Sequence, residues 1–244
     1  MTRILLISDL HLAGERPEPA DRFFRFLEQQ ASQAQALYVL GDLFEYWLGD
    51  DALAAAEGDP LARRVAHAFA ALSRSGVKLY VMHGNRDFLM GDAFARAAHA
   101  TLIDDPSVVA IGGVPTLLMH GDTLCTDDTD YQAWRRICRT PQWQREFLAK
   151  PLAERRRVGE DLRETSRSMA REKPPEIMDV TSGAVRSAFL SHGVARMIHG
   201  HTHRPARHAM EVDGRQCERW VLPDWYGTGG YIEVVDAQPK LVMF

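Results

Sequence analysis

Acidic, amide and imidazole side chains recur directly after short apolar runs of this chain. Isolated "GD" or "GN" pairs are ordinary turn signals, but here both the chain order and the position after an apolar run agree five times over. Mixed carboxylate, amide and imidazole ligands suit borderline first-row metals such as manganese, iron, cobalt or zinc. The pattern therefore predicts a metal site. Its candidate ligands are Asp9, His11, Asp42, Asn85, His120, His201 and His203.

The apolar runs themselves predict buried strands. They are RILLIS (3–8), ALYVLG (36–41), VKLYVMH (77–83), VPTLLMH (114–120) and VARMIH (194–199). Helical spacing over 20–35 and 60–76 alternates with them, which indicates a layered α/β domain. Residues 219–244 predict a further strand, turns at Gly227 to Gly230 and a closing hairpin.

The predicted strands supply a reason for the candidate ligands to meet. Ligands of open α/β sheets bind beyond the carboxyl ends of the strands, where these side chains fall. Alternate residues of an extended segment share a side, so Asp9 and His11, or His201 and His203, can approach one ion together. The neighbouring glycines allow sharp turns and close backbone approach.

Seven candidate ligands exceed what one four-coordinate ion needs. Two ions that share a bridging carboxylate would use all of them, and Asp42 is the natural bridge. Such a pair holds a hydroxide at neutral pH and neutralises the charge of a reacting phosphoryl group.

Four isolated histidines are assigned no ligand role: His67, His99, His192 and His208. His83, which precedes the turn at Gly84, is expected at most to support its neighbours.

Composition limits the remaining classes. The 244 residues carry a formal charge of −4, and the three cysteines have no CxxC spacing, which favours a reducing cytosol over a disulfide framework. The apolar run Ile4 to Ile7 is too short for a signal peptide, and no run approaches the length of a membrane span. Any membrane contact is therefore expected to be peripheral.

One stretch differs from the rest in charge and in pattern. Residues 135–173 contain 12 basic and 6 acidic side chains, and strand signals disappear over 126–179. We expect a helical cap insertion at 126–179 and a core formed by 1–125 and 180–244. A run such as Arg155 to Arg157 is usually a solvated helix face, but beside a metal site it could also attract phosphate-bearing ligands or an anionic membrane.

The motif series resembles the calcineurin-like metallophosphoesterase superfamily over nearly the whole chain. The motifs are DLH (9–11), GD (41–42), GNRD (84–87), HGD (120–122) and GHTH (200–203). The longer stretches GDLFEYWLGDD, HGNRDFL, HGDTLCTDD, IMDV and IHGHTHRP look like the branch of the superfamily that hydrolyses an acylated nucleotide sugar in lipid A biosynthesis.

The resemblance implies an α/β (α+β layered) fold with a β-sandwich core flanked by helices, a helical cap and two manganese ions. Asp9, His11, Asp42 and His203 would bind one ion, and Asp42, Asn85, His120 and His201 the other. It implies a catalytic set made of Asp42, Asn85, Arg86, His120 and His201. The substrate contacts would be Asn85, Arg86, Asp128, Ser166, Lys173 and His201, whereas Ala170 stands where relatives carry an asparagine.

The implied partners are the acylated nucleotide sugar and the anionic cytoplasmic face of the inner membrane. No nucleic acid or obligatory protein partner is expected, since a nuclease would show a broader basic face. Arg86 fits a diphosphate substrate, because arginine stays protonated and cannot donate a proton to an alkoxide, whereas a sugar phosphate leaves as an anion. Another nucleotide diphosphatase and a non-catalytic scaffold with the same fold are the alternatives.

Overall fold

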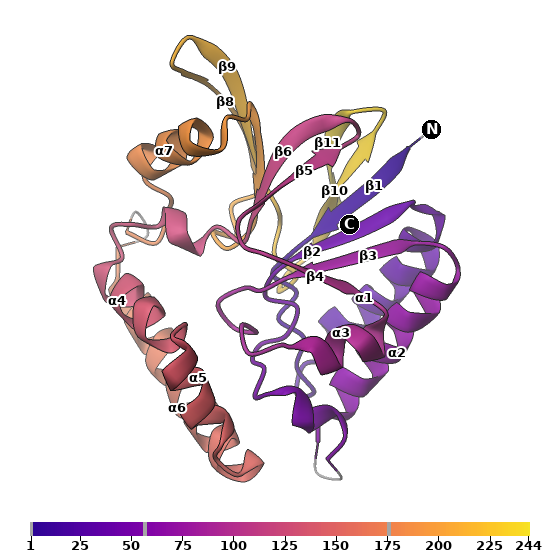
Figure 1. Cartoon of the computed structure of the whole chain (residues 1–244), viewed down its shortest axis with the longest axis vertical. Helices are drawn as coiled ribbons and strands as arrows, with labels where there is room; N and C mark the ends of the chain where they lie inside the picture. The colour runs from indigo at the N-terminus through magenta and orange to yellow at the C-terminus, as the bar shows by residue number, and fades with distance from the viewer. Residues whose placement is uncertain (1, 56–57, 175–176) are drawn as a thin grey trace.

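Two β-sheets pack face to face in the computed structural model of the chain, which describes residues 2–55, 58–174 and 177–244 without the side chains of 165–167 and 169–172 (Figure 1). The larger sheet has six strands in the order β11-β10-β1-β2-β3-β4. β1 to β4 are parallel to one another, and β10 and β11 extend the sheet in antiparallel fashion. Its strands are β1 (Arg3–Ile7), β2 (Ala36–Leu40), β3 (Lys78–Met82), β4 (Thr101–Ile103), β10 (Gly230–Val235) and β11 (Gln238–Met243).

The smaller sheet has five strands in the order β5-β6-β7-β9-β8. Its three central strands are parallel, and the two edge strands are antiparallel to their neighbours. The strands are β5 (Ser107–Ile111), β6 (Val114–Met119), β7 (Arg196–His199), β8 (Ala206–Val212) and β9 (Arg215–Val221).

Helices cover the outer faces of both sheets. α1 (Pro17–Gln29), α2 (Pro60–Arg74) and α3 (Asp92–Ala98) pack on the six-stranded sheet, and α7 (Ser182–His192) packs on the other. The remaining helices form a separate group in Figure 1: α4 (Thr129–Cys138), α5 (Pro141–Leu148) and α6 (Leu152–Glu172). Three short 3-10 turns complete the described elements: η1 (Ala31–Gln33), η2 (Asp50–Leu53) and η3 (Asp122–Leu124).

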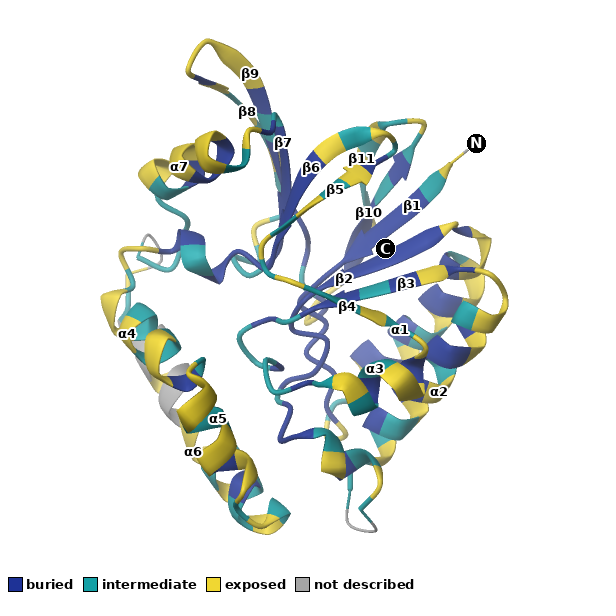
Figure 2. Ribbon diagram, in the orientation of Figure 1, coloured by how far each residue is buried: buried dark blue, intermediate teal, exposed yellow. Residues whose placement is uncertain are grey.

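The period of two along each strand builds these layers. In β1, Leu5 and Ile7 belong to the core beneath α1 to α3, whereas Ile4 and Leu6 lie between the sheets. The central strands are therefore buried on both faces, as Figure 2 shows, and read as continuous apolar runs.

The predicted layered α/β fold is confirmed, and so are the five strand runs, both helices and the closing hairpin. The helix predicted over 20–35 begins earlier, at Pro17, and ends at Gln29. The sequence did not predict β4, β5 or β8. It also did not predict that the five ligand-bearing strands are divided between two sheets.

Candidate metal centre

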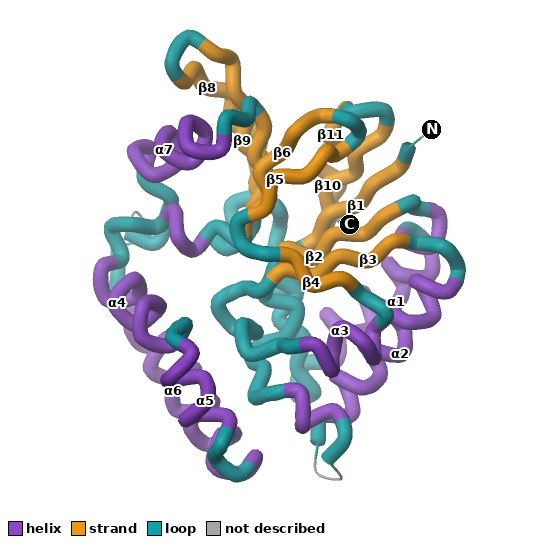
Figure 3. The backbone as a smooth tube through the Cα atoms, viewed as in Figure 1, coloured by secondary structure: helices purple, strands orange, loops and turns teal. Residues whose placement is uncertain are grey.

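The loops that follow five strands converge beside the ends of both sheets (Figure 3). Asp9, Asp42 and Asn85 follow β1, β2 and β3 of the six-stranded sheet. His120 follows β6, and His201 and His203 follow β7, both of the five-stranded sheet. The site is thus assembled where the two sheets meet.

The backbone is left-handed at five of the seven candidate ligands, a conformation that residues other than glycine seldom adopt. The φ angles are 54° at Asp9, 49° at His11, 52° at Asp42, 67° at His201 and 55° at His203. Each such residue costs about 1–3 kcal/mol, and such strain concentrates at functional sites. Extended backbone was expected to bring Asp9 and His11, or His201 and His203, to the same side. That explanation is wrong, because the backbone at these residues is left-handed, although their side chains do lie in one cluster.

Glycines next to the ligands act in two ways. Gly41 and Gly121 turn the chain with φ angles of 88° and 116°. Gly84 and Gly200 instead permit close approach. A Cβ atom on Gly84 would lie 2.1 Å from Asp42 Oδ1, and one on Gly200 would lie 2.2 Å from Asp9 Oδ2.

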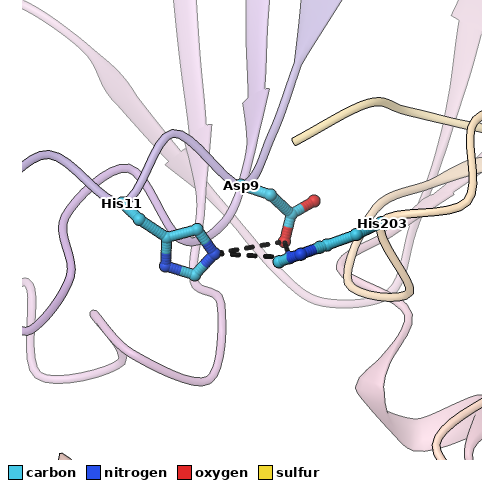
Figure 4. A group of neighbouring side chains, drawn as sticks. All are labelled: Asp9, His11 and His203. Atoms are coloured by element: carbon cyan, nitrogen blue, oxygen red, sulfur yellow. Dashed lines mark hydrogen bonds and ion pairs between the residues drawn. The ribbon is translucent and has the colours of Figure 1, made fainter. Parts of the chain in front are cut away.

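Asp9, His11 and His203 form a first group of ligand atoms (Figure 4). His203 Nε2 lies 3.4 Å from Asp9 Oδ1, and the Nε2 atoms of His11 and His203 are 3.4 Å apart. Ser8 and the backbone of His201 donate hydrogen bonds to Asp9 Oδ2. Within the described residues no hydrogen bond reaches the buried Oδ1 atom, which is left facing the two imidazoles.

Asn85 organises a second group. Its Oδ1 atom lies 2.9 Å from His120 Nε2 and 3.0 Å from His201 Nδ1. Asp42 Oδ1 is 3.8 Å from His120 Nε2, while its Oδ2 is 3.7 Å from His11 Nε2, so Asp42 joins both groups. Ligand atoms of Asp9, Asp42 and His120 also lie within 4.8 Å of one another, so Asp9 reaches both groups as well.

Burial and neighbouring charges oppose each other in the titration of these groups. Burial lowers the pKa of His120, but the carboxylates of Asp42, Asp9 and others raise it to about 9. Burial raises the pKa of Asp42 to about 7, and burial together with His120 lowers that of His201 to about 4. Near neutral pH, protons therefore compete with a cation for Asp42 and His120, whereas His201 is already deprotonated.

The predicted substrate contacts are partly brought together. The backbone N–H of Arg86 donates to Asp42 Oδ1 at 2.8 Å, and its charge is among those that lower the pKa of His11. Asp128 caps α4 and pairs with Lys173 Nζ at 2.5 Å. The side chains of Ser166 and Ala170 lie outside the described residues.

Several residues near the site were not predicted from sequence. Tyr131 of α4 stacks over His201 with 6.1 Å between ring centroids, and its hydroxyl donates to the buried Asp122. Tyr226 stacks on His11 at 4.7 Å. Glu45 lies three residues after Asp42 and is buried beside His11. Nothing in the spacing of Tyr131 or Tyr226 along the sequence could have linked them to the site, whereas Glu45 belongs to the GDLFEYWLGDD motif.

His83 was expected at most to support its neighbours. Its Nε2 atom lies 2.6 Å from the carbonyl oxygen of Met90, at hydrogen-bond distance.

Several cations of the basic stretch contact the core rather than solvent. Arg155 pairs with Asp51, Arg163 with Glu15 and Glu45, and Arg135 with Asp122. The expectation of a solvated face is wrong for Arg155, whose side chain is 2% exposed. Part of the positive charge is therefore used to attach the helices.

Comparison with known proteins agrees with this geometry. A family model described as calcineurin-like phosphoesterase matches residues 2–205. A protein of Aromatoleum aromaticum named UDP-2,3-diacylglucosamine hydrolase is 48% identical over 239 residues, which cover 98% of this chain and 96% of that protein. A protein of the same name from Azotobacter vinelandii is 50% identical over 232 residues, with 94% and 93% covered. Among solved structures, an archaeal phosphodiesterase aligns over all of both chains with a TM-score of 0.49 and 12% identity.

Proposed function

This chain belongs to the calcineurin-like phosphoesterase family, and from the name that its relatives of 48% and 50% identity carry we propose that it hydrolyses the diphosphate of UDP-2,3-diacylglucosamine, releasing UMP and 2,3-diacylglucosamine 1-phosphate. The observation that carries the proposal is that seven side chains following strands of both sheets converge on one largely buried cluster, in which five of them have left-handed backbone. Relatives named for this activity align with the chain over nearly its full length. With that product, the chain would be an enzyme of lipid A biosynthesis.

The donor set fits two divalent ions. Asp9 Oδ1 is buried without a hydrogen-bond donor among the described residues, and imidazole nitrogens face it. We assign Asp9, His11, Asp42 and His203 to one ion and Asp42, Asn85, His120 and His201 to the other. The mixed ligands favour manganese, with iron, cobalt or zinc as substitutes. When bound, such ions would activate water and polarise the phosphoryl oxygens.

The residues of this chain would hold and orient the diphosphate. The positive charge of Arg86 acts on Asp42, and it would stabilise the negative charge that develops during attack on the α-phosphorus. His201, held neutral by burial and His120, is oriented by Asn85. No acid is needed for the sugar phosphate, because it leaves as a stable anion.

We further propose that residues 126–179 act as a cap that receives the acylated sugar. Asp128, Ser166 and Lys173 would contact its polar part. Trp134, Phe147 and Leu148 are the apolar candidates for sheltering acyl chains. Phe147 is already buried against Trp143, so packing of the cap accounts for it, whereas the Leu148 side chain is 40% exposed and is the better candidate.

The proposed location is the cytoplasmic face of the inner membrane, with peripheral association through anionic lipid. In the described part of the chain, no helix is both long enough and apolar enough to pass through a bilayer. An acylated substrate resides in the membrane, and the exposed basic and apolar residues of the cap, such as Arg157 and Leu148, would face it.

The test is to incubate purified protein with the acylated nucleotide sugar and titrated Mn²⁺ and to identify the products. We expect Mn²⁺-dependent release of UMP. Asp42→Asn should lower the rate by more than about 100-fold. Replacing residues that only support metal ligands already lowers metal affinity or activity by about 10–100-fold. Asp21→Asn, on the exposed face of α1, is the matched control and should leave the rate unchanged.

Three results would contradict the proposal at different levels. Equal turnover of acylated and deacylated substrate would remove the lipid specificity and favour another nucleotide diphosphatase. Full activity of Asp42→Asn would remove the bridging role. Absence of any Mn²⁺-dependent hydrolysis would favour a non-catalytic scaffold.

A further inference from the structure

Glu45 is a buried carboxylate that the catalytic assignment leaves without a role. It follows β2 and Asp42, and its side chain is 2% exposed. Arg16 Nη2 lies 2.6 Å from Glu45 Oε2, and the hydroxyl of Tyr226 donates to the same oxygen at 3.0 Å. Arg163 Nε lies 3.0 Å from Oε1. A carboxylate removed from water in this way is held by three partners from distant parts of the chain.

These partners surround His11. Glu45 Oε2 is 3.7 Å from His11 Nδ1, on the opposite side of the ring from Nε2, which faces Asp9 and His203. Tyr226 stacks on the His11 ring with an interplanar angle of 14°. Arg16 donates to the His11 carbonyl oxygen at 3.1 Å and lies over the Tyr226 ring. The ring is thus supported on its face and at its backbone, while the Glu45 carboxylate faces Nδ1 at 3.7 Å, an electrostatic contact longer than a hydrogen bond.

Glu45 also joins His11 to α6. Arg163 belongs to that helix, and its guanidinium group is shared between Glu45 and the more exposed Glu15. A second arginine of α6, Arg155, attaches the helix independently by pairing with Asp51 and donating to the Leu48 carbonyl. Within the described part of α6, Arg155 and Arg163 therefore anchor the helix to the core at two separate places, and of these two arginines Arg163 is the one that contacts Glu45.

We propose that Glu45 is a positioning residue that orients His11 for metal binding and that, through Arg163, makes metal affinity depend on the docking of α6. A histidine that binds a metal usually turns its other ring nitrogen toward a carboxylate or carbonyl, which fixes the tautomer and raises the basicity of the ligating nitrogen. Glu45 is the carboxylate in that position, and it favours a proton on Nδ1, which leaves the Nε2 lone pair for the cation. The inference rests on the proposed metal centre.

The test measures Mn²⁺ affinity of the full-length protein by isothermal titration calorimetry after removal of metal by chelation. Glu45→Gln removes the charge with little change of shape and should weaken binding at one of two sites by about 10–100-fold. Arg163→Met should weaken the same site, by a smaller factor. Because Arg163 acts through Glu45, the double variant should bind no more weakly than Glu45→Gln alone.

Arg155→Met is the matched control. It removes the other anchor of α6, so it should increase the rate of amide hydrogen exchange in that helix. Arg163→Met should have the same effect on exchange, but only Arg155→Met should leave Mn²⁺ affinity at the wild-type value.

Unchanged affinity in Glu45→Gln would overturn the inference. So would equal weakening in Arg155→Met and Arg163→Met, because helix docking in general would then explain both. If Glu45→Gln does not fold, the comparison of the two arginine variants still decides. A wild-type protein that binds no Mn²⁺ would instead contradict the metal centre itself.

Discussion

At the scale of single residues, the site depends on conformations that are costly for the residues that adopt them. Five candidate ligands have positive φ angles. Gly84 and Gly200 each precede a ligand, and a Cβ atom on either would lie closer to a carboxylate oxygen than van der Waals contact allows. The sequence predicted which residue types gather here, because DLH, GD and GHTH are readable as motifs. The left-handed backbone was not predicted, because aspartate and histidine adopt positive φ more often than most residues but still only in a small minority of cases.

Gly84→Ala tests the close approach at the site. The added methyl group would lie 2.1 Å from Asp42 Oδ1 and 2.3 Å from the Asp42 backbone nitrogen, so the ligand loop must move. We expect a loss of about 1–3 kcal/mol in unfolding free energy, together with weaker Mn²⁺ binding. Denaturant unfolding and calorimetry measure the two effects.

Gly183→Ala is the control for this substitution. Gly183 lies in α7 with nothing within 4 Å of a new Cβ atom, so alanine should stabilise the protein by up to about 1 kcal/mol. Normal Mn²⁺ affinity in Gly84→Ala would show that the loop has room that the structure does not provide.

At the scale of elements, α6 shows how a helix rich in charge can still have an inner face. Arg155, Gly159 and Arg163 are spaced by four residues and therefore share one side of the helix. Arg155 and Arg163 pair with core carboxylates, and a Cβ atom on Gly159 would lie 3.0 Å from Leu48 Cδ2. From the sequence alone, the run Arg155 to Arg157 was interpreted as a solvated helix face. The sequence does not show that a core carboxylate, Asp51, lies opposite Arg155.

Arg155→Met should loosen α6 without unfolding the core. The substitution removes charge-assisted hydrogen bonds to the Leu48 carbonyl and to Asp51, and the Asp51 pair contributes little because that carboxylate is 59% exposed. We expect a combined loss of about 1.5–3 kcal/mol, which corresponds to amide exchange in α6 that is roughly 10–100-fold faster. Hydrogen exchange followed by mass spectrometry measures it, with β1 to β3 as the internal reference.

Arg157→Met is the comparison for that experiment, since Arg157 is exposed on the same helix and should leave exchange unchanged. Equal acceleration in the two variants would mean that total charge, and not the buried contact, holds the helix.

At the scale of the whole molecule, sequence predicted the strands better than their arrangement. Most residues are buried in four of the strands, β1, β2, β6 and β7. Because both faces of each strand are covered, all four appear in the sequence as similar continuous apolar runs. Nothing in such runs says which sheet a strand joins. β5 and β8, which were not predicted, are edge strands of alternating exposure, and β8 also has few strongly apolar residues. The candidate ligands could be picked out from local motifs, whereas the junction of the two sheets that brings them together depends on tertiary packing.

Because the candidate ligands lie at that junction, the proposed metal centre would affect the stability of the entire protein. Asp9, Asp42 and Asn85 follow strands of the six-stranded sheet, and His120, His201 and His203 follow strands of the other. Ions bound by both sets would link the sheets and would bind only the folded state. At a free Mn²⁺ concentration of about 100 times Kd, one site adds about 2.7 kcal/mol. For a chain of this size that is about 5–10 °C in Tm, measurable by differential scanning calorimetry.

The rise in Tm should depend on the ligands from both sheets. Asp42→Asn and His120→Ala, which alter ligands that follow strands of different sheets, should each reduce it. His67→Ala, which removes an exposed imidazole from α2, should retain the full rise. Mg²⁺, which prefers oxygen ligands, should stabilise the protein less than Mn²⁺ at equal concentration, because imidazole makes up much of the donor set. If Tm is the same with Mn²⁺ and with chelator, the two sheets are not joined through metal, and their contact depends on the apolar layer between them alone.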